Sequence, residues 1–188
     1  HPKLVEEVIP NLIPLGTLVR VLSHLLREGV PIRDLRTILE TVADHAASTK
    51  DPDILTEVAR QALGRTITKP YLAPDGSLPI IGLDPRLDRT LADQANAAGQ
   101  GNQWVPDPLV AQKLLTALKA AAERMVGRGH QPVILCSPSL RRHLRKLTDR
   151  ILHSVPILGM NEVESVTRLQ AMETVRLDLE VGESRSLA

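Results

Sequence analysis

Residues 26–41 read LREGVPIRDLRTILET, and they show how the first part of the chain folds. The opening residues complete a run of apolar positions at helical spacing, made up of Leu15, Leu18, Val19, Leu22, Leu25 and Leu26. Gly29 follows this run, and glycine readily takes the left-handed conformation in which many helices end. A second run comprises Ile32, Leu35, Ile38, Leu39, Val42 and Ala46. The stretch therefore predicts the end of one amphipathic helix, a tight Gly-Val-Pro link and the start of another.

A third helix is expected soon after the first two. Asp51 is followed by Pro52, and these residues are typical of an N-cap and of the first helical position. The positions that would face a core are Ile54, Leu55, Val58, Ala62 and Leu63. Because connections of a few residues join these helices, residues 1–68 are predicted to form a compact antiparallel helical subdomain.

The chain changes character from about residue 69. Residues 70–77 read PYLAPDGS, which is typical of turns, and residues 78–83 then predict a strand. Residues 132–136 and 155–158 are two more short apolar runs, and a predicted helix lies between them. A strand, a helix and a strand in this order favour a βαβ unit with parallel strands.

Helix starts recur in this second part with one signature, a capping residue before a proline. They lie at Asp84-Pro85, Asp107-Pro108 and Ser137-Pro138. Residues 175–177 are expected to add an edge strand, and residues 96–103 read as a mobile loop. The last residues, 183–188, are expected to form a flexible tail.

The sequence as a whole predicts a mixed α/β fold. A helical N-terminal subdomain over residues 1–68 is followed by a small α/β subdomain over residues 69–182, which contains the βαβ unit. Because the periodicity changes near residues 68–74, the two are expected to be separate packing units.

The composition is typical of a globular protein, with 43% hydrophobic and 24% charged residues. Tyr71 and Trp104 are its only aromatic residues, which argues against binding of single-stranded nucleic acid, because such binding needs stacking platforms. The net charge of +1 gives no general attraction for polyanions. No apolar run reaches the roughly 18 residues of a transmembrane helix. The chain opens with His1-Pro2-Lys3, without an initiator methionine or a signal peptide, and this favours a fragment of a longer protein.

Cys136 is the only cysteine, so an internal disulfide is excluded and a reducing compartment is favoured. Its position before a helix start raises one catalytic hypothesis, a thiol nucleophile with His143 or His153 as its base. The competing interpretation is a small apolar side chain at the end of a buried strand. The second interpretation is favoured, because no oxyanion-hole motif or third catalytic residue is recognisable. The protein is therefore expected not to be an enzyme.

No metal or cofactor site is expected. None of the six histidines pairs with another at the i, i+4 spacing of a zinc site, and there is no second cysteine. A glycine-rich phosphate-binding loop is also missing, since Gly127-Arg128-Gly129 has the features of a helix end followed by a turn.

The most basic segment is the predicted helix after Pro138. Its cations are Arg141, Arg142, Arg145, Lys146 and Arg150. The favoured interpretation is a solvated face of a helix that packs through Leu140, Leu144, Leu147 and Ile151. A docking surface for an acidic protein partner comes second. Contact with a nucleic-acid backbone comes last, because the net charge is close to zero and aromatic residues are scarce.

Arg33, Asp34 and Arg36 form a smaller charged group near the start of the second helix. Their simplest interpretation is a solvated face, and the alternative is a contact surface for a neighbouring subunit. The carboxylates along these helices show no convergent pair, so no acid–base chemistry is expected there.

Five blocks of the sequence together resemble the large export-gate family of bacterial type III secretion, in its flagellar branch. They are residues 26–41, EVARQALGRTIT at 57–68, IIGLD at 80–84, PVILCSPSLR at 132–141 and VPIL at 155–158. The blocks follow the family's order with similar spacing, and the resemblance fades after about Glu164. The virulence-type, or injectisome, branch is closely related, and GVPIRDLR at residues 29–36 favours the flagellar one.

The resemblance implies a non-enzymatic docking platform in the cytosolic part of the export gate. Residues 1–68 would correspond to the family's helical third cytosolic subdomain, which contributes ring contacts. Residues 69–182 would correspond to the fourth, near which the stalk of the export ATPase docks. The implied partners are export chaperones with their substrates, the stalk protein, other gate components and further copies of the chain in a ring.

No nucleic acid and no membrane contact are implied for this fragment. The resemblance places the whole protein at the cytoplasmic face of the bacterial inner membrane, anchored by upstream segments. The family's chaperone pocket lies mainly in subdomains outside this chain, so no binding residues are carried over. Because no long apolar surface patch is evident, the chain alone is expected to be monomeric or weakly associating. A cysteine hydrolase and a nucleic-acid adaptor are the alternatives from other classes.

Overall fold

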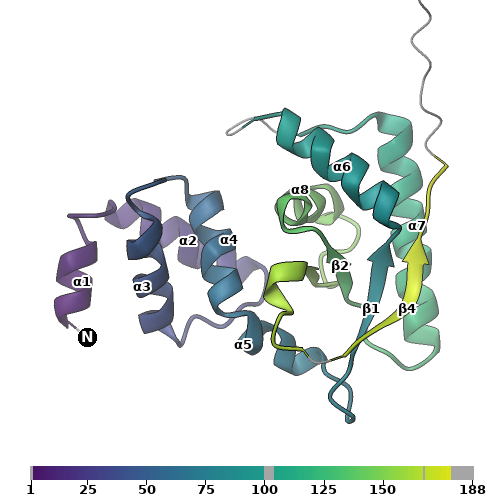
Figure 1. The fold of residues 1–188 in the computed structure, drawn as a ribbon, viewed down its shortest axis with the longest axis horizontal. Helices are drawn as coiled ribbons and strands as arrows, with labels where there is room; N and C mark the ends of the chain where they lie inside the picture. The colour runs from purple at the N-terminus through teal and green to yellow at the C-terminus, as the bar shows by residue number, and fades with distance from the viewer. Residues whose placement is uncertain (1, 100–103, 167, 179–188) are drawn as a thin grey trace, which may run out of the picture.

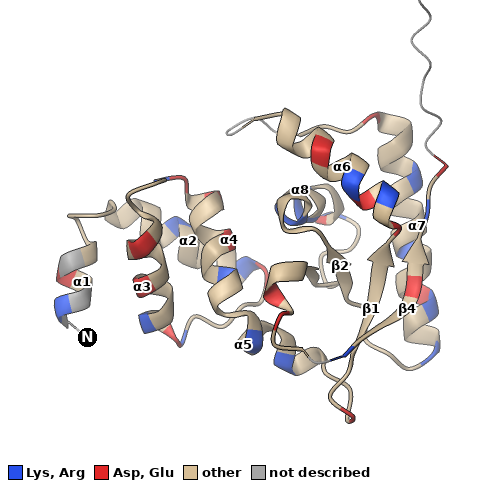
Figure 2. Ribbon diagram, in the orientation of Figure 1, with Lys and Arg blue, Asp and Glu red and all other residues tan. Residues whose placement is uncertain are grey.

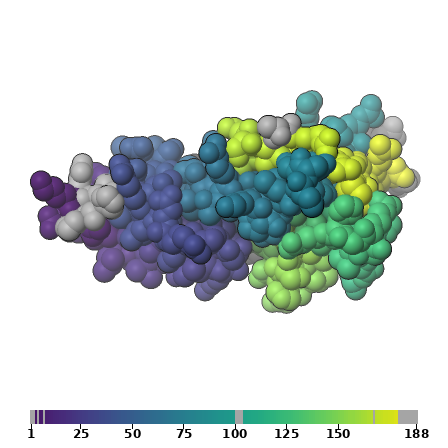
Figure 3. Space-filling view, turned by 90° about the horizontal axis from the view of Figure 1, so that it is seen from below, coloured from purple at the N-terminus to yellow at the C-terminus, as the bar shows by residue number. Residues whose placement is uncertain are grey.

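The computed structural model describes residues 2–99, 104–166 and 168–178, and it has two halves that lie end to end (Figure 1). The loop expected at residues 96–103 therefore falls half outside the described residues, and the tail expected at residues 183–188 falls wholly outside them. Figure 3 shows the elongated molecule from below, with the helical half forming one end.

The first half is helical, as the sequence predicts. Its elements are α1 (Pro2–Val8), α2 (Leu15–Arg27), α3 (Leu35–His45), α4 (Pro52–Ala62), the short α5 (Gly64–Thr68) and the 3-10 helix η1 (Lys69–Tyr71). Gly29 follows α2 with a φ of 70°, which confirms the predicted glycine end. The Asp34 carboxylate caps α3 by accepting a hydrogen bond from the Thr37 N–H at 3.2 Å. Asp51 caps α4 in the same manner, so the predicted Asp-Pro start is confirmed.

The second half is built on a parallel four-stranded sheet with the order β3-β2-β1-β4. Its strands are β1 (Leu78–Leu83), β2 (Ile134–Cys136), β3 (Ile157–Gly159) and β4 (Leu169–Val175). Its helices are α6 (Pro85–Ala97), α7 (Pro108–Gly127) and α8 (Pro138–Thr148), with the 3-10 helix η2 (Met160–Glu162) directly after β3. Because β2, α8 and β3 form the predicted βαβ unit, the mixed α/β class is confirmed.

The edge strand differs from its prediction. The sequence predicts it at residues 175–177, whereas β4 covers Leu169–Val175. Only Val175 of this strand is buried, and polar residues such as Gln170 and Glu173 interrupt it, so it has no apolar run to mark it. Strand β4 forms because it pairs with β1 along its whole length, and its amino-acid composition alone does not predict it.

The start of α8 is also stabilised in an unexpected way. Ser137 precedes Pro138 as predicted, but its side chain does not cap the helix. The Ser137 Oγ is buried without a hydrogen-bond partner among the described residues. The Ser137 N–H donates to Asp88 Oδ1 at 3.0 Å, so a side chain of α6 positions this end of α8.

The sheet separates two apolar clusters. Ile81, Ile134 and Ile157 pack in the cluster that includes the buried residues of α6, α7 and α8. Leu78 and Leu158 belong instead to the cluster that forms the core of the helical half. The prediction of separate packing units is therefore wrong at the sheet, although no strand inserts among α1 to α5 in the described ranges. The division into subdomains at residue 68 stays a prediction, since the core of the helical half continues past that residue to one face of the sheet.

Candidate docking site at the junction of the two halves

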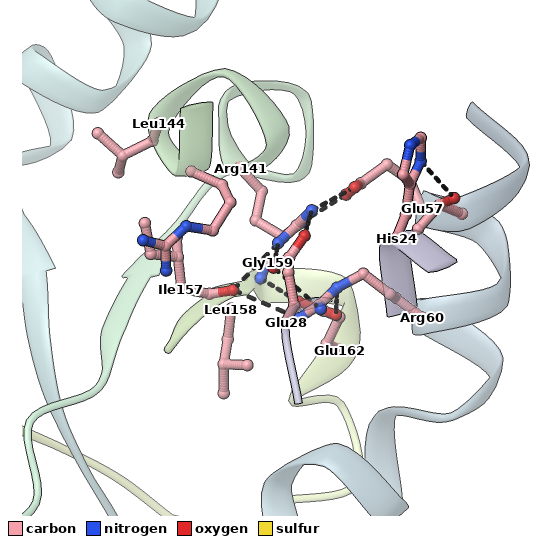
Figure 4. A network of polar contacts seen from close by, with 12 residues as sticks. His24, Glu28, Glu57, Arg60, Arg141, Leu144, Ile157, Leu158, Gly159 and Glu162 are labelled. Atoms are coloured by element: carbon pink, nitrogen blue, oxygen red, sulfur yellow. Dashed lines mark hydrogen bonds and ion pairs between the residues drawn. The ribbon is translucent and has the colours of Figure 1, made fainter. Parts of the chain in front are cut away.

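Arg141 of α8 lies where the two halves meet, and only 2% of its surface is exposed. Its Nε donates to Glu57 Oε2 at 2.6 Å, and its Nη1 donates to Glu28 Oε2 at 2.7 Å. Glu57 belongs to α4, and Glu28 follows the last residue of α2. A cation of the α/β half is therefore bound by two carboxylates of the helical half (Figure 4).

Arg60 of α4 makes the reciprocal connection, and it too is 2% exposed. Its Nε donates to Glu162 Oε1 at 2.7 Å, and its Nη1 donates to Glu28 Oε2 at 3.2 Å. Glu162 lies in η2 and also accepts a hydrogen bond from the Gly159 N–H at 2.5 Å. Glu28, Glu57, Arg60, Arg141 and Glu162 together form what we call the junction network (Figure 4). Figure 2 shows that basic and acidic segments lie together where the halves meet.

Two members of the junction network, Glu28 and Arg141, keep their charges although they are largely buried. Burial raises the pKa of Glu28, but attraction by Arg141 and Arg60 and the hydrogen bond from Arg141 bring it below the ordinary value of 4.5. Burial lowers the pKa of Arg141, and Glu57 and Glu28 raise it well above its ordinary value. Glu28 and Arg141 are therefore both charged at neutral pH. Arg141 depends on carboxylates of the other half for its compensation, whereas Glu28 is compensated by Arg141 of the other half and Arg60 of its own.

Arg145 lies one turn further along α8 and is 9% exposed. Its Nη1 and Nη2 donate to the carbonyl oxygens of Val155 and Leu152, at 2.9 and 3.1 Å, and so fix the loop after the helix. Burial lowers the pKa of this guanidinium, while Glu28 and Asp149 oppose the change. Its Nε has no hydrogen-bond partner among the described residues. Arg145 is therefore a buried cation with one donor group unused.

These positions correct the hypothesis that one exposed basic face of α8 serves for docking. Arg141 and Arg145 are spaced by about one helical turn, so they lie on the same side of α8. That side faces the interior, and both residues are enclosed. Carboxylates of the helical half already bind Arg141, and backbone carbonyls bind Arg145. The favoured interpretation, a solvated face on a helix that packs through four apolar residues, holds only in part. Leu140 and Leu144 are buried as that interpretation requires, but Ile151 is 51% exposed.

Three cations of this segment remain accessible. Arg142 is half-buried, and Lys146 and Arg150 are exposed. The Lys146 Nζ lies 2.8 Å from Asp53 Oδ2 of α4, which adds a second ionic link between the halves. A docking role for Arg142, Lys146 and Arg150 stays a prediction.

Arg33, Asp34 and Arg36 lie away from the junction, exposed at the start of α3. Asp34 caps that helix, and the Arg36 Nε donates to Glu40 Oε1 at 2.8 Å one turn further on. This arrangement fits the solvated face that the sequence favours. Contact with a neighbouring subunit stays a prediction for these residues.

Beside the junction network the two halves enclose a cleft of about 600 Å³, which we call the junction cleft. Its lining includes the cations Arg27, Arg142 and Lys146 and the apolar or aromatic residues Ile67 and Tyr71. The volume lies within the range of about 300–1,000 Å³ that is usual for ligand pockets. Sequence reasoning missed this site, because its walls come from segments that only the packing of the two halves brings together.

Cys136 is enclosed in β2, with 3% exposure, and its Sγ lies 3.9 Å from the Leu158 carbonyl oxygen. Burial raises the pKa of its thiol well above the ordinary value, and Asp88 adds to this effect. His143, one of the bases considered above, packs edge-on against Trp104, with the ring centroids 6.1 Å apart.

A protonated, enclosed thiol is a poor nucleophile. We therefore expect iodoacetamide to alkylate Cys136 slowly in the native protein and rapidly after unfolding in guanidinium chloride, as followed by mass spectrometry. Rapid and complete alkylation of the native protein would contradict this expectation and favour the thiol-hydrolase hypothesis.

The chain matches a known protein family over most of its length. The profile of the FHIPEP family matches residues 1–168. The chain is 39% identical over 174 residues to the flagellar biosynthesis protein FlhA of Salmonella typhimurium, and 34% identical over 175 residues to that of Bacillus subtilis. Each alignment covers 93% of this chain, but only 24% and 26% of the two relatives. The chain thus spans about a quarter of the length of these relatives.

Solved structures of similar proteins share the fold. The nonameric EPEC SctV-C matches with a TM-score of 0.81 and 29% identity, over 93% of this chain and 52% of that one. The structure of the Chlamydia pneumoniae CdsV and CdsO protein complex matches with a TM-score of 0.80 and 27% identity, over 93% of this chain and 51% of that one. The arrangement of a helical half beside an α/β half is therefore shared with these proteins.

Proposed function

This chain belongs to the FHIPEP family, and on that premise we propose that it is a cytosolic portion of a type III protein export gate, in the flagellar branch. The observation that carries the proposal is the 34–39% identity to flagellar biosynthesis proteins across 93% of the chain. The similar SctV-C and CdsV structures are 29% and 27% identical, so a virulence-type gate is the alternative.

We propose that this portion is a docking platform and not an enzyme. Its partners would be export chaperones with their substrates, the stalk protein of the export ATPase and other gate components. Two observations support this role: the similar CdsV was solved in a complex with CdsO, and the junction cleft offers a site for a protein segment. The site of action would be the cytoplasmic face of the bacterial inner membrane. No helix within the described ranges combines the length and apolar character needed to cross a membrane.

The outer face of α2 suggests how copies of the chain would meet. Leu15, Val19 and Leu26 recur at helical spacing on this helix and are 59%, 52% and 56% exposed. The expectation that the surface lacks an apolar patch is therefore wrong for this helix, since three large apolar side chains share one stripe. We propose that this α2 stripe contacts a neighbouring copy in a ring, as an exposed apolar stripe favours association. The nonameric assembly of SctV-C supports the ring.

The isolated chain should associate weakly through this stripe. We expect the weight-average sedimentation coefficient to rise with protein concentration, because one narrow stripe buries too little surface for a tight complex. The variant Leu15→Ser, Val19→Ser should remain monomeric over the same concentrations. The control Val126→Ser, which changes a 61% exposed residue of α7, should behave like the unmodified chain. Equal association of all three proteins would rule out the α2 stripe.

Disruption of the gene tests the proposed function in the bacterium that carries it. We expect flagellin to disappear from the culture medium while it is still synthesised in the cell, and a plasmid copy of the gene should restore export. Loss of injectisome effectors from the medium with normal flagellin export would assign the chain to the virulence-type branch. Normal export through both systems would overturn the proposal.

A further inference from the structure

Two cations in the lining of the junction cleft, one from each half of the molecule, are free to bind a ligand. Arg27 comes from the last turn of α2 and is exposed, and Arg142 comes from α8 and is half-buried. Within the described residues neither side chain takes part in an ion pair, in contrast to Arg60, Arg141 and Lys146 nearby. An anionic group that entered the cleft would therefore meet positive charge from both halves of the molecule.

Arg145 supplies a second, independent observation. It lines the same cleft and is nine-tenths buried, and its Nε has no hydrogen-bond partner in the described part of the chain. This Nε is itself enclosed, so the Arg145 side chain would have to shift before an acceptor in the cleft could reach it. A buried donor without a partner is unfavourable, and an acceptor that reached it after such a shift would be stabilised. A carboxylate suits such a group, because charged hydrogen bonds are stronger than neutral ones.

The charge balance of the lining points the same way. Six arginine and lysine side chains line the cleft against four aspartate and glutamate side chains, which leaves an excess of two positive charges. The four carboxylates, Glu28, Asp53, Glu57 and Asp149, all lie within ion-pair distance of cations of the cleft. Glu162 lies outside this lining and pairs with Arg60, so it balances one of the two excess charges and leaves one available to a ligand.

The cleft also has an apolar side. Val30, Ile67, Pro70 and Tyr71 contribute to its lining, next to the cations. A phosphate backbone, which carries no aliphatic group, would gain little from such a surface. A peptide that carries both acidic and aliphatic side chains would satisfy both parts of the cleft.

We propose that the junction cleft binds an acidic, partly apolar segment of a partner protein, with at least two carboxylates placed around an aliphatic side chain. One carboxylate pairs with Arg27 or Arg142 at the mouth of the cleft, and the aliphatic side chain lies against Ile67 and Tyr71. The proposal goes beyond the export-gate function and does not depend on it, since it rests only on the residues of the cleft.

Binding of the fluorescein-labelled peptide Glu-Asp-Leu-Glu-Val-Asp-Leu-Glu tests the proposal by fluorescence anisotropy. We expect saturable binding to the 188-residue chain that weakens from low to physiological salt, because the contact is ionic in part. The amide peptide Gln-Asn-Leu-Gln-Val-Asn-Leu-Gln should bind much more weakly. The double variant Arg27→Gln, Arg142→Gln should bind the acidic peptide about tenfold more weakly, the effect of two exposed or partly exposed ion pairs.

The matched control is Arg86→Gln, Arg89→Gln, which removes two positive charges from exposed positions of α6 outside the cleft. This control should leave the affinity for the acidic peptide unchanged. Circular dichroism of both double variants should match that of the unmodified chain, since neither variant removes an ion pair between described residues. Equal loss of affinity in the two double variants would show that the peptide responds to overall charge, and it would overturn the proposal.

The unused donor of Arg145 gives a readout that does not depend on a variant. In a ¹⁵N-labelled protein the Arg145 Nε–H resonance should shift when the acidic peptide is added, while the Nε–H resonance of Arg89 should not. An absence of peptide binding, or binding without any shift of the Arg145 resonance, would contradict the site. A thymidine oligonucleotide that bound more tightly than the peptide and lost affinity in the Arg27→Gln, Arg142→Gln variant would overturn the proposal in favour of a phosphate site.

Discussion

Replacement of Arg141 by methionine should lower the free energy of unfolding by about 3 kcal/mol. The change removes the cation that binds Glu28 and Glu57 and leaves the Glu57 carboxylate facing an apolar side chain. Loss of one partner of a buried ion pair typically costs about 3–5 kcal/mol. The lower end applies here, because Glu28 keeps its pairing with Arg60 and the two carboxylates retain some solvent contact. At roughly 2–4 °C per kcal/mol for a chain of this size, the melting temperature should fall by about 6–12 °C.

The matched control is Arg142→Met, one position further along the same helix. Arg142 is half-buried and has no ion-pair partner within the described ranges, so its replacement should change stability by no more than about 0.5 kcal/mol. Urea unfolding followed by circular dichroism measures both variants. Equal stability of the two variants would show that the junction network does not hold the halves together.

Replacement of Gly64 by alanine should destabilise the protein by about 2 kcal/mol. A Cβ atom at this position would clash with the Glu162 backbone carbonyl oxygen, so η2 or α5 would have to move. Displacement of Glu162 would also weaken its ion pair with Arg60 in the junction network. This loss should exceed the gain of up to about 1 kcal/mol that alanine brings to a helix over glycine.

Gly16→Ala in α2 is the control for the helix-forming tendency alone. Nothing lies within 4 Å of a Cβ built at Gly16, and its φ is negative, as for Gly64. This variant should be unchanged or more stable by about 0.5 kcal/mol in the same urea measurement. A Gly64→Ala protein as stable as Gly16→Ala would contradict the close contact between α5 and η2.

The helix starts of this protein were open to prediction, because they depend on residues adjacent in the sequence. Asp51, Asp84 and Asp107 each precede a proline, and each accepts a hydrogen bond from a backbone N–H of the first turn. The two central strands were also visible as short apolar runs, since both of their faces are buried. Strand β4 was not, because it is a half-exposed edge strand whose conformation depends on pairing with β1.

The candidate site could not be predicted, because its contacts join distant parts of the chain. Arg141 was visible as a cation on an amphipathic helix, but Glu28 and Glu57 lie 113 and 84 residues away in the sequence. Arginine is seldom fully buried, so a solvated face was the reasonable expectation. The one local signal was the spacing of Arg141, Arg145 and Thr148, which places three polar residues on the side of α8 that is enclosed.

The most direct test of the proposed function measures how much flagellin cells export when their copy of this protein carries Leu15→Asp and Val19→Asp. The substitutions place charge on the exposed α2 stripe and leave the buried residues of α2 unchanged. If this chain works as part of a ring in a flagellar export gate, flagellin in the culture medium should fall to background at normal levels of the gate protein. The control Val105→Asp, Val126→Asp, which changes exposed residues outside the stripe, should export normally. Wild-type export by the Leu15→Asp, Val19→Asp cells would contradict assembly of the gate through α2.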